Sequence, residues 1–199
     1  NGLELCAKIK NNIEYSHIPV ILLTAKVLPE AKVEGFSYGA DAYVEKPFTI
    51  LQLHMQIRNL LKLRTTFQQH MTSFLPDAKP EEKEEEETGI QLTPQDQEFI
   101  KKMQEIIEQQ LADESFSIDT LAAEMNMSRS NFYRKLKALS GMPPNDYLKN
   151  CRLNKAAQLL KEGYRVTEVF ERTGFGSSSY FAKCFKAKFG VLPKDYISN

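Results

Sequence analysis

One segment of the chain occurs twice, as SRSNFYRKLKALSGMPPNDY (128–147) and, 49 residues later, as SSSYFAKCFKAKFGVLPKDY (177–196). Nine of the aligned positions are identical, including Gly141 and Gly190. The segments IDTLAAEMNM and TEVFERTGFG, which are equal in length, precede the two copies. Each predicts a short helix and a turn before a longer helix, which is the spacing of a helix-turn-helix motif. The sequence therefore predicts two such units in one chain.

The longer helix of each copy has an apolar face and an opposite face of small polar and basic side chains. The apolar stripes consist of Phe132, Leu136 and Leu139 in the first copy and Phe181, Phe185 and Phe189 in the second. The outward faces consist of Ser130, Tyr133, Arg134 and Lys137 in the first copy and Ser179, Ala182, Lys183 and Lys186 in the second. Such a face suits the major groove of DNA, because small residues allow close approach, Arg can pair with guanine and Lys can contact phosphates.

Charge is unevenly distributed along a chain of 199 residues whose net charge is zero. Residues 128–199 contain fourteen Lys and Arg residues against five Asp and Glu residues, whereas residues 81–87 read EEKEEEE. A basic domain in a neutral chain indicates a polyanionic partner for that domain. The alternative is a helical module that binds protein and not DNA, and a salt titration of DNA binding would distinguish the two.

The helical periodicity of the C-terminal half predicts helices at 94–112, 118–125, 129–140, 145–161, 167–173 and 178–189. Thr93 and Pro94 provide a capping residue followed by proline at the first helical position. Helix 145–161 is predicted to be the core helix that spaces the two units, with Leu148, Leu153, Ala156, Ala157 and Leu160 buried.

Residues 94–199 resemble an AraC/XylS-type DNA-binding domain. The resemblance rests on LAAEMNMSRSNFYRKLKALSG, NCRLNKAAQLL and GFGSSSYFAKCFKAKFGVLPKDY. It implies an all-α domain that places two helices in successive major grooves of double-stranded DNA and controls transcription, with RNA polymerase as a further candidate partner. By position, it implies base-facing roles for Ser130, Tyr133 and Arg134 in the first helix and for Ser178, Ser179 and Lys183 in the second, and phosphate contacts for Arg129, Lys137 and Lys186.

The N-terminal part has a different pattern, with helices at 3–13, 29–38 and 49–63 and strands at 18–24 and 42–45. The continuous apolar run IPVILLT is typical of a strand that is covered on both faces of a parallel sheet. An α/β layer fold needs more than two strands. We therefore expect the remaining strands to lie upstream of Asn1.

Residues 1–64 resemble the C-terminal part of a CheY-like receiver domain, on the basis of NGLELCAKIK, IPVILLTAK and GADAYVEKPF. The resemblance implies that Thr24 and Lys46 are the residues that contact the phosphoryl group, that Tyr43 is the switch aromatic, and that Pro47 follows a cis peptide bond. The phospho-acceptor aspartate and the acidic Mg²⁺ pair have no counterpart here, because Asp41 and Glu45 stand at other positions. We therefore expect no cofactor in this fragment, and Mg²⁺ only in a complete receiver.

The combined prediction is a mainly α chain with a partial α/β fragment that contains two strands. Its domains are the C-terminal part of a receiver (1–72), an acidic linker (73–92) and the DNA-binding domain (93–199). The predicted function is sequence-specific transcription regulation at the output end of a two-component phosphorelay. The parent would be a hybrid sensor kinase or, alternatively, a stand-alone response regulator.

Several further expectations follow from this prediction. The residues contain no nucleophile–base pair and no metal-ligand set, so we expect no enzymatic activity here and assign any histidine kinase activity to upstream sequence. We expect a bacterial, cytoplasmic segment without membrane contact, in a full-length parent that forms a homodimer and can be anchored in the inner membrane.

Overall fold

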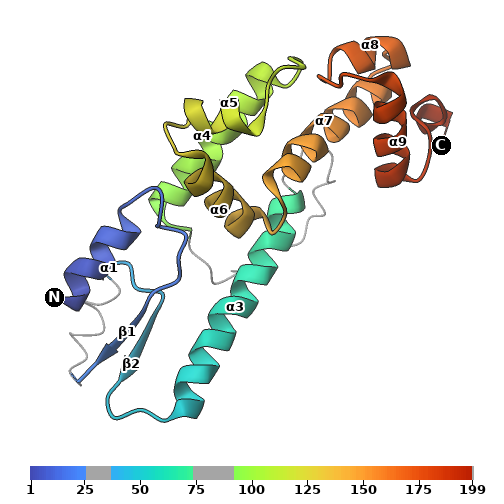
Figure 1. The fold of residues 1–199 in the computed structure, drawn as a ribbon. Helices are drawn as coiled ribbons and strands as arrows, with labels where there is room; N and C mark the ends of the chain where they lie inside the picture. Colours follow the sequence, from blue (N-terminus) through green and yellow to red (C-terminus); the bar gives the residue numbers. More distant parts are fainter. Residues whose placement is uncertain (26–36, 74–91, 199) are drawn as a thin grey trace. The chain divides into compact units, whose positions relative to one another are not determined.

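The computed structural model describes residues 1–25, 37–73 and 92–198. The described residues divide into two compact units (Figure 1). Among the described residues, the first contains 1–25, 37–69 and 92–101, and the second contains 70–73 and 102–198. No helix among the described residues is both long and apolar enough to cross a membrane.

The first unit contains the helix α1 (Gly2–Lys10), the strands β1 (Ile21–Thr24) and β2 (Ala42–Glu45), and the helix α3 (Ile50–Ser73) as far as Gln69. The strands are parallel, with Ile21 opposite Ala42. Parallel strands need a crossover connection between them. The predicted helix 29–38 would lie in that connection, but it falls largely outside the described residues, as does most of the predicted linker 73–92.

A buried lysine organises the first unit. Lys10, at the end of α1, pairs with the Asp41 carboxylate at 2.6 Å and donates hydrogen bonds to the carbonyl oxygens of Ser16 and Ile18, at 3.3 and 2.9 Å. Asp41 also accepts a 2.6 Å hydrogen bond from the Val20 N–H. A charge removed from water needs such partners. The contacts of Lys10 therefore fasten α1 to the segments that lead into both strands.

The helix α3 is longer than the sequence predicted. It was expected to cover 49–63 and continues to Ser73. The hydroxyls of Thr65 and Thr66 donate to the carbonyl oxygens of Leu61 and Lys62 within the helix, at 3.1 and 3.3 Å. These bonds occupy the side-chain groups that otherwise compete with helical hydrogen bonding.

The first turn of α4 (Pro94–Gln110) lies in the first unit and has a polar contact with it. The buried Ser16 hydroxyl donates to the buried Asp96 carboxylate at 2.8 Å. The Asp96 N–H in turn donates to the Thr93 hydroxyl at 3.2 Å. Thr93 therefore acts as the cap that the sequence predicted, and Asp96 connects the start of α4 to the loop after α1.

The second unit is built from helices whose ends agree with the predicted ones to within two residues. They are α5 (Ile118–Glu124), α6 (Arg129–Ser140), α7 (Pro144–Lys161), α8 (Val166–Glu171) and α9 (Ser178–Phe189), followed by the 3-10 helix η1 (Pro193–Ser198). Figure 1 shows α7 between the α5–α6 pair and the α8–α9 pair. The five α7 residues predicted to be core are all buried, so α7 is the common core helix of both pairs.

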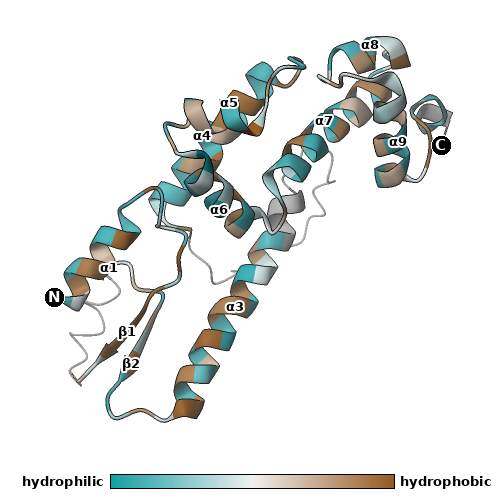
Figure 2. Cartoon of the chain, in the orientation of Figure 1, coloured by the Kyte–Doolittle hydropathy of each residue, from teal (hydrophilic) through white to brown (hydrophobic). Residues whose placement is uncertain are grey.

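The core around α9 is aromatic. Phe185 is fully buried and has ring neighbours at 5.7 Å (Phe181), 4.5 Å (Phe189) and 5.2 Å (Tyr196) between centroids. Figure 2 shows the apolar residues of α7 and α9 alternating with hydrophilic ones along each helix. The predicted apolar stripes are therefore confirmed as inward-facing, with Phe189 only partly buried.

Candidate nucleic-acid interface

The two repeated helices, α6 and α9, are called the reading helices below. Each begins after a serine whose hydroxyl caps the helix: Ser128 accepts from the Asn131 N–H at 3.3 Å, and Ser177 accepts from the Tyr180 N–H at 3.4 Å. Each ends at a glycine in the left-handed region, Gly141 (φ 75°) and Gly190 (φ 81°), which L side chains rarely adopt. The repeat thus sets the same start and end for both reading helices.

The first reading helix exposes most of the side chains predicted to contact DNA. Arg129, Ser130, Arg134 and Lys137 are exposed, and Tyr133 is half-buried. Arg129 pairs with Asp119 of α5 at 2.9 Å, and the Arg134 guanidinium donates to the Asn131 side-chain oxygen. Both pairs are at the surface, where ion pairs and hydrogen bonds contribute little and exchange readily for a ligand.

One basic residue of α6, Lys135, is buried and not exposed. The sequence counted Lys135 as part of the basic charge, yet its relative exposure is 0%. It lies next to Leu136 on the inward face, so it adds no charge to the outward surface. The available signal was its position within the apolar stripe, three residues after Phe132 and one before Leu136.

The second reading helix exposes Ser178, Ser179, Lys183 and Lys186, while Ala182 is half-buried. Tyr180 is also exposed, at 52%, and its ring lies 6.3 Å from that of Phe175. The sequence prediction omitted Tyr180, which corresponds to Asn131 in the repeat. An exposed aromatic residue beside two serines gives this helix a hydrogen-bonding side chain that the prediction lacked.

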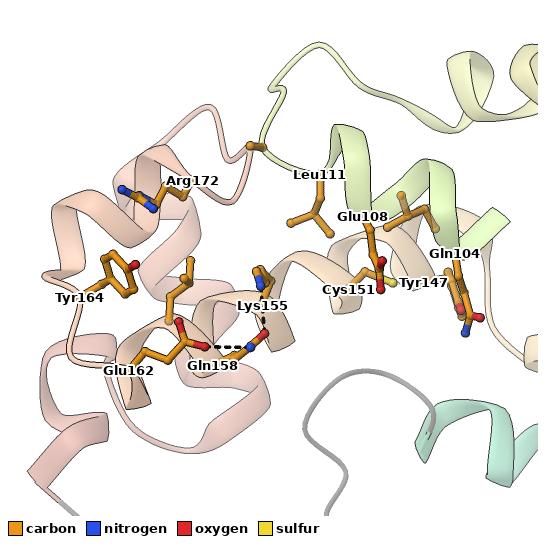
Figure 3. A pocket seen from close by; sticks show the side chains of 13 residues that line it. Gln104, Glu108, Leu111, Tyr147, Cys151, Lys155, Gln158, Glu162, Tyr164 and Arg172 are labelled. Carbon is orange, nitrogen blue, oxygen red and sulfur yellow. Dashed lines mark hydrogen bonds between the residues drawn. The ribbon is translucent and has the colours of Figure 1, made fainter. Parts of the chain in front are cut away.

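A groove of about 920 Å³ is lined by α4 and the two residues after it, by α7, and by Tyr164 and Arg172 on either side of α8 (Figure 3). A chain of hydrogen bonds runs along one wall, from the Lys155 ammonium to Gln158 at 3.0 Å and from the Gln158 amide to Glu162 at 2.8 Å. None of the residues predicted to contact DNA lines it. The groove therefore belongs to the core helix and not to the reading helices.

The residues predicted to contact a phosphoryl group lie at the carboxyl ends of the two strands. Thr24 is the last residue of β1, and its carbonyl accepts a 2.7 Å hydrogen bond from the Lys46 N–H. The Lys46–Pro47 bond is cis, as predicted, and the Lys46 side chain is exposed. Tyr43 is half-buried, on the face opposite Ala42 and Val44. The fold thus brings Thr24 and Lys46 to one edge of the sheet.

Asp41, by contrast, lies just before β2, at the amino ends of the strands. It is held there by Lys10 and by the Val20 N–H. Over the ranges that the structure describes, no three His, Cys, Asp or Glu side chains are placed to hold a metal ion together.

The comparisons with known proteins agree with both parts of this description. Residues 121–199 match the family model described as a helix-turn-helix domain, and residues 1–58 match that of the response regulator receiver domain. These matches first define the class, a helix-turn-helix protein with a receiver segment. The chain therefore contains a receiver segment followed by an AraC-type helix-turn-helix domain.

Two curated relatives and one solved structure illustrate this relationship. The chain is 35% identical to "Histidine kinase P4" of Formosa agariphila over 98% of its own length and 14% of the relative's. It is 32% identical to "HTH-type transcriptional regulator MtrA" of Neisseria gonorrhoeae over 58% of the chain and 38% of that relative. The C-terminal domain of the two-component response regulator yesN from Fusobacterium nucleatum is 30% identical, with a TM-score of 0.47, over 50% of this chain and 98% of that domain. The chain thus spans only a minor part of both curated relatives.

Proposed function

We propose that the chain is a DNA-reading output segment of a two-component transcription regulator, and that α6 and α9 enter successive major grooves of one duplex. The observation that carries this proposal is the repeated arrangement of the reading helices. In both, aromatic and leucine side chains are buried on one face while serine, arginine and lysine are exposed on the other. Helix-turn-helix proteins place their second helix in the major groove.

The two reading helices differ in the side chains that they would present to DNA. Arg134, Tyr133 and Ser130 of α6 would read bases, and Arg129 and Lys137 would contact phosphates. In α9, Ser178, Ser179 and Lys183 would face bases and Lys186 a phosphate. The short side chains of α9 allow a close approach but offer fewer bidentate contacts. We therefore assign most of the direct base readout to α6.

The proposal also includes control of DNA binding by phosphorylation of the receiver. Thr24, Tyr43 and Lys46 lie in the segment that matches a receiver, and we propose that they respond to phosphorylation of a complete receiver domain with bound Mg²⁺. Receiver pairing would then place two DNA-binding domains on adjacent sites and raise affinity through avidity. Similarity to a relative named as a histidine kinase favours a hybrid parent, located in the cytoplasm or at the inner membrane, over a stand-alone regulator. Any kinase activity belongs to other parts of such a parent, and RNA polymerase remains a candidate partner.

A salt titration tests DNA binding. Duplexes selected from a random pool would be titrated with the chain between 50 and 200 mM salt. We expect log K to fall linearly with log salt, at a slope of about −0.9 for each phosphate contacted. Lys137→Ala should reduce the slope by about one, whereas Lys194→Ala, an equally exposed lysine outside the predicted interface, should leave it unchanged. A flat salt dependence would favour the protein-interaction alternative.

A second experiment tests base readout by Arg134. Arg134→Lys keeps the charge but loses the planar pair of donors that matches guanine. We expect a loss of about 1–3 kcal/mol on the selected sequence and relaxed specificity at one base step. Asn131→Ala, which removes the side-chain partner of Arg134, is the matched control and should preserve specificity. An equal loss on all sequences would reassign Arg134 to the DNA backbone.

Control by phosphorylation is tested in the longer parent protein. A phosphomimetic substitution at its acceptor aspartate should increase both self-association, measured by analytical ultracentrifugation, and affinity for paired sites. If both remain unaltered, the proposed control mechanism is wrong, while DNA binding by this segment would still stand.

A further inference from the structure

One arginine of the core helix contacts both helix-turn-helix units. Arg152 lies midway along α7, and its Nη2 donates hydrogen bonds to the carbonyl oxygens of Asp113 and Phe116, at 2.9 and 3.0 Å. Both carbonyls belong to the loop between α4 and α5. This loop leads directly into Ser117, which caps α5 of the first helix-turn-helix unit (α5 and α6). Arg152 therefore holds the entrance to the first helix-turn-helix unit.

The same guanidinium lies against the turn of the second helix-turn-helix unit (α8 and α9). Gly174, in the turn between α8 and α9, has φ +65° and is buried. A Cβ atom at this glycine would lie 3.0 Å from both Nε and Nη2 of Arg152 and would collide with the carbonyl oxygen of Leu111. Two features therefore require glycine at position 174, namely the positive φ angle and the close approach of the guanidinium.

A second contact joins the same two segments. A Cβ atom at Gly176 would collide with the carboxylate of Glu114. The loop 111–116 and the turn 174–176 thus meet directly, with Arg152 beside them. Burial lowers the pKa of the Arg152 guanidinium, while Asp113 and Glu114 act in the opposite direction. Its Nε is buried without a hydrogen-bond partner among the described residues.

We propose that Arg152 is a positioning residue, which fixes α9 relative to α6 by holding loop 111–116 and turn 174–176 together. This inference rests on the proposed DNA-binding function. Its consequence is that Arg152 determines which separation of the two half-sites the chain accepts. Lysine is a poor replacement, because its shorter side chain has no planar group that can pack against Gly174 while a terminal nitrogen reaches both carbonyl oxygens.

The test measures half-site spacing and not affinity alone. The full chain would be titrated with the selected duplex and with versions that carry one or two extra base pairs between the half-sites. Each added pair rotates and shifts the second half-site, since a duplex turn contains about 10 base pairs. We expect wild-type protein to lose at least about tenfold in affinity for each insertion, in the range of a base mismatch.

The variants separate positioning from folding. Arg152→Met and Arg152→Lys should reduce the insertion penalty to less than about threefold, and Gly174→Ala should do the same from the opposite side of the contact. Arg172→Ala is the control: the ring on which this arginine stacks, at 4.8 Å, is that of Tyr164, which lies outside both loops, so its variant should keep the wild-type penalty. Far-UV circular dichroism would verify that each variant is folded.

Each outcome has a defined meaning. Failure of the wild-type chain to bind any duplex contradicts the proposed function itself. Normal binding with an undiminished insertion penalty in Arg152→Lys and Gly174→Ala overturns the positioning role. If Arg152→Met does not fold, the two other variants decide, because they keep a long side chain at 152 or leave Arg152 in place.

Discussion

Truncation of Phe185 to alanine gives a quantitative test of the second helix-turn-helix unit. The side chain is fully buried and has three aromatic neighbours within 5.7 Å between ring centroids. A buried phenylalanine removes about 150–250 Å² from water, which corresponds to about 4–6 kcal/mol at roughly 25 cal/mol per Å². Since alanine retains part of this area and the core partly relaxes, we expect Phe185→Ala to lower the free energy of unfolding by about 3–5 kcal/mol.

Urea denaturation of the full chain, followed by far-UV circular dichroism, would measure this loss. The two compact units require separate transitions in the fit. Leu136→Ala is the matched variant, because Leu136 is the equivalent position in the first copy and is also fully buried; its expected loss is about 2–5 kcal/mol. Phe189→Ala, at a partly buried ring, should cost less than Phe185→Ala. A loss below about 1.5 kcal/mol for Phe185→Ala would contradict the inferred aromatic core.

Three further predictions concern the Cys151 thiol, the Lys10–Asp41 ion pair and the left-handed Gly190. Burial raises the pKa of the Cys151 thiol from its ordinary 9.0 to about 12, so the folded state favours the neutral thiol. Stability should be fully present below pH 9 and decline towards pH 12, by up to about 1.4 kcal/mol per pH unit, and Cys151→Ala should flatten this decline in urea titrations at several pH values. Asp41→Asn should destabilise the first unit by about 2–4 kcal/mol, because Lys10 stays buried without its carboxylate, and the double variant with Lys10→Met should recover part of this loss. Gly190→Ala should cost about 1 kcal/mol from backbone strain alone, since its Cβ would meet no atom within 4 Å; thermal unfolding would detect this, and no change would contradict the left-handed assignment.

The sequence predicted the helices of the second compact unit well, because the sequence patterns that determine helix bounds are local. The spacing of apolar residues acts within one or two turns and placed α6 and α9 at their observed bounds, 129–140 and 178–189. In the structure, capping serines and left-handed glycines define these same ends, and they too act locally. The outward faces followed from the same periodicity, since a residue's face is fixed once the helix and its buried stripe are known.

The features that were missed either lack a local apolar pattern or depend on residues far apart in the sequence. The extension of α3 to Ser73 crosses a polar stretch without strong periodicity. The burial of Lys10 depends on Asp41, a residue that comes 31 positions later in the chain. Likewise, the role of Arg152 arises from two loops, at 111–116 and 174–176, that meet only in the folded domain. No pattern around any one of these residues indicates its partner.

In both repeated helices, the side chains that hold the domain together and those turned to solvent occupy separate positions. Exchanging the solvent-facing set of one copy for another set would leave Phe181, Phe185 and their counterparts in the first copy untouched. Duplication within one polypeptide also frees each copy to diverge alone, which two identical subunits of a symmetric dimer cannot do. Under the proposed DNA-binding function, such a scaffold can acquire new operator preferences through a few surface substitutions that change the folding free energy little.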